Sequence, residues 1–403
     1  MISKLFVALF SFVLLYFSYL AVTTTPILLG EVDSLTYHIP MAEAFAEGNF
    51  KDLFYIPRGL GYYPGVGEII LSLFIKLNIP LGLFNVLGLV LLFFGCKLTA
   101  RVFGLGREAS LAFATTFSLL PTVLRLVLTQ TIDIWLAVFF LCSLSLLQKP
   151  KRSISYFLKI GFSLGFLVGV KYSGILLMLA LSAVYLRKVL PMLTAKRFIA
   201  FFVPFVILGF TWYARNWIIT GTPIYPVAFL DWQADPNFHA TDWTSIKVFL
   251  EPGGVWLMIQ SLISEYLFWS LAPLLVVLIY YYSKIKKHRE LLKDLMPLVV
   301  LAVINFFIFL PQPSLPDMQI VISNMRFVYP VMIPIMLFVF VVAKRLRILK
   351  ELTIVALLSS ISVLPQFDYR PKLIIVWLIF VGITLAVPQK ILKLLNIREE
   401  RKY

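Results

Sequence analysis

The stretch PGVGEIILSLFIKLNIP, residues 64–80, decides the topology of the whole chain, because it either crosses a membrane or lies along its surface. Its uncharged run between Glu68 and Lys76 has only seven residues. A helix of that length covers about 10 Å, against a hydrocarbon core of about 30 Å. Prolines bracket the stretch at both ends. We therefore predict an interfacial helix here, within one long loop over residues 23–80.

Apolar runs follow one another along the rest of the chain. Of 403 residues, 60% are hydrophobic and only 14% are charged, a composition that is unusual for a soluble protein. The first run lacks a small-residue cleavage site and is interpreted as a retained helix rather than a signal peptide. We find no internal repeat and predict one all-α membrane domain over residues 1–403. We expect twelve spans: the first helix, then 81–100, 109–124, 134–148, 153–170, 172–186, 198–214, 262–283, 294–311, 327–343, 351–365 and 373–388.

The basic residues give the expected orientation. If the amino terminus is inside and 64–80 does not cross, 24 Lys and Arg residues fall in inside loops and ten in outside loops. A crossing at 64–80 would place later clusters such as KIKKHRE (284–290) outside, against the positive-inside rule. We therefore predict a multi-pass cell-membrane protein with both termini cytoplasmic. The net charge of +16 is explained by the same concentration of Lys and Arg in inside loops. We therefore expect no nucleic-acid partner.

Acidic residues sort the other way, and several stand at the outer ends of predicted spans. Glu31, Asp33 and His38 follow the first span, and Asp133 opens a later one. Each aspartate could simply cap a helix; DSLTYHIPMAEAFAEG has the pattern of a short amphipathic helix that ends at Gly48. Capping does not explain Glu31 beside Asp33, or the second acid at the next outside loop. We interpret Asp33 and Asp133 as candidate catalytic residues, with Glu31 as the next candidate.

Basic and aromatic side chains share the predicted outer face with these acids. Any one cation could be a snorkelling interface anchor, and His38 could be an ordinary hydrogen-bonded histidine. Several adjoining spans have 15–17 uncharged residues, about 22–26 Å of helix, so their end charges should lie near the headgroups. This pattern suits a lipid-linked substrate with an anionic head. The candidate substrate-binding residues are His38, Arg58, Tyr62, Tyr63, Arg125, Lys171, Arg215, Asn216 and Arg326.

Metal sites have little support in the residue pattern. The three histidines show no ligand spacing, and Cys96 and Cys142 lie inside apolar runs, where we expect neither a disulfide nor a cysteine site. The sequence leaves open whether Asp33 and Asp133 share a divalent cation.

A series of motifs in the same order resembles the C-type (GT-C) membrane glycosyltransferases, especially their protein O-mannosyltransferase and aminoarabinose-transferase branch. The resemblance covers roughly residues 30–335. It rests on EVDSLTYHIPMAEAFAEGNF, PRGLGYYPGVGEIILSLF, LPTVLRLVLTQTIDIWLAVFF, GVKYSGILL, RNWIITGTPIYP and NMRFVYPVMIP. There are departures: Glu-Val-Asp replaces the adjacent acids of many relatives, Arg58-Gly59 stands where Lys-Pro is frequent, and no large soluble carboxy-terminal domain follows.

The resemblance implies transfer of a sugar from a polyprenyl-phosphate donor to a lipid, glycan or protein acceptor outside the membrane. Asp33 would be the base and Asp133 would orient the acceptor or share a cation. Arg58 and Arg326, helped by Lys171, would stabilise the leaving phosphate, and the long 215–261 loop would cover the sugar or acceptor. Two alternatives are a lipid or saccharide transporter or flippase and a non-catalytic assembly subunit. A transporter should show two related halves and charged or broken helices near the midplane; we find no half-repeat.

Overall fold

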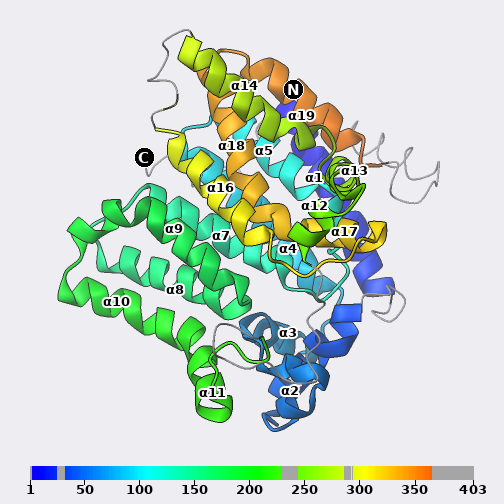
Figure 1. The fold of residues 1–403 in the computed structure, drawn as a ribbon, viewed down its shortest axis with the longest axis vertical. Helices are drawn as coiled ribbons and strands as arrows, with labels where there is room; N and C mark the ends of the chain where they lie inside the picture. Colours follow the sequence, from blue (N-terminus) through cyan, green and yellow to red (C-terminus); the bar gives the residue numbers. More distant parts are fainter. Residues whose placement is uncertain (1, 25–31, 228–243, 286–291, 293, 365–403) are drawn as a thin grey trace.

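Helices of very different lengths make up the structure, a computed structural model that describes residues 2–24, 32–227, 244–285, 292 and 294–364 (Figure 1). No strand occurs within these ranges. Glu31 and the expected span 373–388 lie outside the described residues. The all-α prediction is confirmed for the part of the chain that is described.

The first 80 residues contain one long helix, α1 (Ile2–Thr23), and then a group of short ones. The expected long loop is not seen, because its described part folds into successive helical turns whose apolar side chains pack together. Tyr37, Met41, Phe45, Leu53 and Ile56 share one small core. The turns are η2 (Ser34–His38), α2 (Ile39–Glu47), η3 (Asp52–Tyr55), η4 (Pro57–Tyr62) and α3 (Val66–Lys76).

Two local predictions in this segment are confirmed. The helix after Asp33 ends at Gly48, which takes the left-handed conformation with φ of 74°, as a helix-ending glycine does. The helix within 64–80 has 11 residues, about 16 Å at 1.5 Å per residue, and cannot cross a membrane.

The middle of the chain is a set of packed helices. Among them α8 lies against α10 and η6 along a glycine stripe: a Cβ on Gly161 or Gly169 would overlap the carbonyls of Phe201 and Leu208. Small residues allow such close helix packing. The helices are α4 (Leu83–Val102), α5 (Arg107–Ser118), α6 (Pro121–Leu124), α7 (Asp133–Gln148), α8 (Ile154–Val170), α9 (Ser173–Val189), η5 (Leu190–Met192), α10 (Ala195–Phe205), η6 (Val206–Phe210) and α11 (Thr211–Thr220).

The last described part surrounds a central helix. Figure 1 shows α18 (orange) between α5, α14 and α16, all of which it contacts. The helices are α12 (Ser245–Leu250), α13 (Gly254–Tyr266), η7 (Leu267–Leu271), α14 (Ala272–Ile285), α16 (Met296–Phe309), α17 (Met318–Asn324), η8 (Met325–Val328), α18 (Tyr329–Arg345) and α19 (Leu349–Ile361).

Six stretches of the described chain are long and apolar enough to cross a membrane, not the twelve expected: Ile2–Thr23, Leu83–Val102, Ser173–Met192, Ala195–Thr220, Gly254–Tyr280 and Met318–Arg345. Three further apolar helices, Asp133–Gln148, Ile154–Val170 and Met296–Phe309, have 14–17 residues and reach only about 21–26 Å. The expected span 109–124 is interrupted because Pro121 starts a new helix and holds Leu120 extended. These lengths suggest a multi-pass membrane protein.

Candidate functional site

A chain of ion pairs joins four of the predicted residues. Arg326 Nη2 lies 2.7 Å from Asp33 Oδ2, and its Nε lies 3.6 Å from Asp133 Oδ2. Lys171 Nζ lies 2.8 Å from Asp133 Oδ1. Two carboxylates and two cations from four separate elements therefore meet in one cluster. We call Asp33, Asp133, Lys171 and Arg326 the charged cluster.

Burial differs sharply between the two acids of the charged cluster. The side chain of Asp133 is 3% exposed, whereas that of Asp33 is 38% exposed. Arg326 is 9% exposed and Lys171 20%. Phe327 lies under both cations, with its ring centre 4.2 Å from Lys171 Nζ and 5.1 Å from the Arg326 guanidinium carbon. The cluster therefore has a buried end at Asp133 and an accessible end at Asp33.

The capping alternative is not supported for either aspartate. Asp33 makes no side-chain hydrogen bond to the first turn of its helix, although Asp317 does so at α17. Asp133 is the first residue of α7, and Ile132 occupies the capping position. Both carboxylates instead point to cations from distant elements.

A π-helical turn places the residues after Asp33. In η2 the amide of Ile39 bonds to the carbonyl of Ser34, a five-residue step that is frequent at functional sites. The Ser34 hydroxyl accepts a hydrogen bond from the Gln130 amide at 2.9 Å. This bond attaches η2 to the 125–132 segment that leads to Asp133.

His38 ends this turn and pairs with Glu68 of α3. The Nδ1 to Oε1 distance is 2.6 Å, and both side chains are 1% exposed. Tyr37 packs against the His38 ring, with centroids 4.0 Å apart, and Tyr63 packs on Tyr37. Burial first, and the Asp33 carboxylate second, raise the pKa of Tyr37 and Tyr63 well above the ordinary tyrosine value. Both hydroxyls therefore stay protonated near the cluster and can donate hydrogen bonds.

A second group of predicted residues gathers at the carbonyl of Tyr62. Arg215 Nη2 donates to it at 2.7 Å, Asn216 Nδ2 at 2.9 Å and the Tyr172 hydroxyl at 3.1 Å. The same Tyr172 hydroxyl also lies against the Tyr225 carbonyl, so its single proton is shared between the two carbonyls. Three segments far apart in sequence are thus held together beside Lys171, the neighbour of Tyr172.

Two predicted cations lie apart from the charged cluster. Arg125 pairs with Glu265 of α13 and donates to the Ile322 carbonyl at 3.2 Å. Arg58 is exposed on a turn with φ of 59°. Its side chain makes no ion pair with any residue in the described ranges.

Glu68, Glu265, Tyr172 and Phe327 are among the residues of these groups that were not predicted. Glu68 and Glu265 are buried acids inside apolar helices, and a lone carboxylate in such a run is the signal that could have indicated them. Tyr172 and Phe327 follow Lys171 and Arg326 directly, and nothing in their local pattern distinguishes them from other interfacial aromatics.

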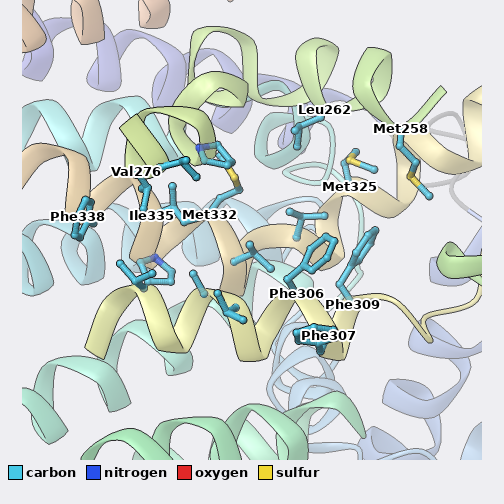
Figure 2. Close-up of a pocket in the computed structure, with 18 of the residues that line it drawn as sticks. Met258, Leu262, Val276, Phe306, Phe307, Phe309, Met325, Met332, Ile335 and Phe338 are labelled. Carbon is cyan, nitrogen blue, oxygen red and sulfur yellow. The ribbon is translucent and has the colours of Figure 1, made fainter. Parts of the chain in front are cut away.

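A large apolar cavity is lined in part by η8, the turn that carries Arg326. Its volume is about 580 Å³, and its lining side chains come from α12, α13, α14, α16, η8 and α18. Figure 2 shows Met258, Leu262, Phe306, Met325 and Met332 around it. Met325 and Val328 line the cavity, and Arg326 lies between them in η8. The cavity wall and the charged cluster therefore share one helical turn.

Asp33 and Asp133, the pair for which the sequence left a divalent cation open, both have cationic partners. Among the described residues, no group of three or more His, Cys, Asp or Glu side chains could hold a metal ion.

Comparison of the chain with models of protein families, with curated proteins and with solved structures found no match.

Proposed function

We propose that the protein is a membrane glycosyltransferase that moves a sugar from a polyprenyl-phosphate donor to an acceptor on the extracytoplasmic side. The observation that carries the proposal is the position of Arg326, between two cavity-lining residues and within the charged cluster. An apolar cavity next to buried cations suits a molecule with a long hydrocarbon part and an anionic head.

In this proposal the lipid chain occupies the cavity and the phosphate contacts Arg326. A guanidinium can bind two phosphate oxygens at once, and Lys171 adds a second positive charge nearby. The phosphate gains negative charge as the sugar leaves, so cations held in place at this point stabilise the transition state.

Asp33 is the proposed base, since it is the more exposed acid of the cluster and can reach an acceptor from outside. The acceptor oxygen bonds to the anomeric carbon, and the bond from that carbon to the phosphate oxygen breaks. Its electrons stay on the phosphate, and Asp33 takes the proton of the acceptor. Asp133, fixed by Lys171, keeps Arg326 in place.

The residues around Tyr62 would shape the side of the site that takes the sugar or the acceptor. Tyr63 offers a protonated hydroxyl there, and Arg215 and Asn216 hold the backbone that carries it. In this arrangement Arg215 and Asn216 position the site.

The direct test is release of polyprenyl phosphate from purified protein incubated with a panel of lipid-linked sugars and acceptors. Wild type should release it, and Asp33→Asn should not. Asp52→Asn is a matched control, because Asp52 is an exposed acid of the same segment that accepts a hydrogen bond from Asn49 at 2.8 Å. If the wild type binds the lipid-linked sugars but releases polyprenyl phosphate from none of them, the result contradicts the transferase and favours a transporter or an assembly subunit.

A further inference from the structure

Arg326 already has anionic partners where the proposed donor phosphate has to bind. Asp33 contacts its Nη2 at 2.7 Å, and Asp133 lies 3.6 Å from its Nε. Asp133 is at the same time bound by Lys171 at 2.8 Å. The charged cluster is therefore neutral, with two carboxylates and two cations.

A phosphate entering this neutral cluster would leave one negative charge in excess. Holding an uncompensated anion in a buried site is costly, so binding is favourable only when one carboxylate moves away. The two acids differ in their ability to do this. Asp133, 3% exposed, would lose its cation in a buried position, whereas Asp33, 38% exposed, can turn toward water.

We propose that the donor phosphate displaces Asp33 from Arg326, and that this exchange frees the base only when the donor is bound. The inference rests on the proposed function. Asp33 Oδ2 accepts the hydrogen bond of Arg326 and cannot take the proton of an acceptor with the same lone pair. Once phosphate replaces it, Asp33 stands beside the bound donor with that oxygen available. Donor binding thereby prepares the base.

The exchange makes a prediction that a simple base would not make: removing the charge of Asp33 should tighten donor binding while it abolishes transfer. We would measure the binding of a polyprenyl monophosphate to purified protein in nanodiscs, for wild type, Asp33→Asn and the control Asp52→Asn. We expect Asp33→Asn to lower Kd about tenfold, which corresponds to about 1.4 kcal/mol. The control should bind as wild type does. The parent polyprenol, which lacks phosphate, should bind equally to all three.

Asp33→Asn could tighten binding in a second way, by removing general repulsion between Asp33 and the phosphate. A double-mutant cycle separates this repulsion from competition for Arg326. Competition at Arg326 requires that the tightening disappears in an Arg326→Gln background. Repulsion alone would persist there. Arg326→Lys serves as a second background if the Gln variant does not fold, and the tightening should shrink in it.

The outcomes distinguish this inference from the proposed function. If Asp33→Asn binds polyprenyl phosphate as tightly as wild type or more weakly, the exchange is overturned. The proposed transferase still stands in that case, provided that the wild type binds polyprenyl phosphate and releases it from lipid-linked sugars. Tightening that persists without Arg326 also overturns the exchange. A wild type that neither binds nor releases polyprenyl phosphate contradicts both.

Discussion

His38 and Glu68 form a buried pair, with Nδ1 2.6 Å from Oε1 and both side chains 1% exposed. The pair joins η2 to α3 and so fixes the segment that carries Asp33. Removing one partner of a buried pair strongly destabilises the folded protein, because the other polar group is left buried without its partner.

The first prediction concerns the stability of this pair. Glu68→Ala and His38→Ala should each lower the free energy of unfolding by about 3–5 kcal/mol. The double variant Glu68→Leu with His38→Phe should recover most of the loss, because no buried polar group stays unpaired. Thermal unfolding in detergent measures this. Single variants as stable as wild type would show that the pair does not hold the two helices together.

The second prediction concerns the two acids. Asp33→Asn should abolish transfer while the protein still inserts and purifies, because Asp33 is partly exposed and does not hold the core. Asp133→Asn should impair transfer severely and lower thermal stability as well, since Lys171 loses a buried partner. Turnover and melting temperature are measured on the same preparations. Near-normal turnover in Asp33→Asn would move the role of base to Glu31.

The third prediction concerns Arg326. Lysine keeps the charge but loses the planar guanidinium, so Arg326→Lys should weaken use of the lipid donor and Arg326→Ala should cost more. Charge-assisted hydrogen bonds contribute about 1.5–3 kcal/mol, so the alanine variant should lose about ten- to a hundredfold in kcat/KM. Donor-dependent kinetics would show kcat falling as well, if the contact strengthens as the bond breaks. Unchanged kinetics in Arg326→Ala would make this arginine a structural residue.

The fourth prediction concerns the cavity. Ala302 of α16 lines it and is 4% exposed, so Ala302→Phe should fill part of the space and raise KM for the lipid donor about tenfold, the scale of a few lost apolar contacts. Val300→Phe is the matched control on the same helix, because Val300 is 44% exposed and does not line the cavity. Equal KM values in the two variants would mean that the lipid binds elsewhere.

The fifth prediction concerns topology. Cysteines placed at Lys51 and Lys151, both exposed, should differ in labelling by an impermeant thiol reagent in intact cells. We expect labelling at 51, outside, and not at 151, inside, in a chain whose two native cysteines are replaced. Labelling of 151 alone would reverse the predicted orientation.

The sequence by itself determined the features that depend on neighbouring residues. Apolar runs predicted the helical class, Gly48 predicted the end of the helix after Asp33, and the seven uncharged residues of 64–80 excluded a crossing there. It also singled out Asp33, Asp133, Lys171 and Arg326, because charged residues at the ends of apolar runs are conspicuous.

Only the tertiary structure decided which charges meet. Asp33 and Arg326 are 293 residues apart, and a periodic pattern reports the face of one helix, not which helix lies opposite. For the same reason the sequence grouped Arg58 with Arg326, although Arg58 lies exposed and apart, and it did not reveal Glu68 as the partner of His38. Within the described residues, the number of spans was overestimated because hydropathy counts apolar runs. Whether a run is one continuous helix depends on breaks such as Pro121, and whether it is long enough depends on where its helical hydrogen bonds end.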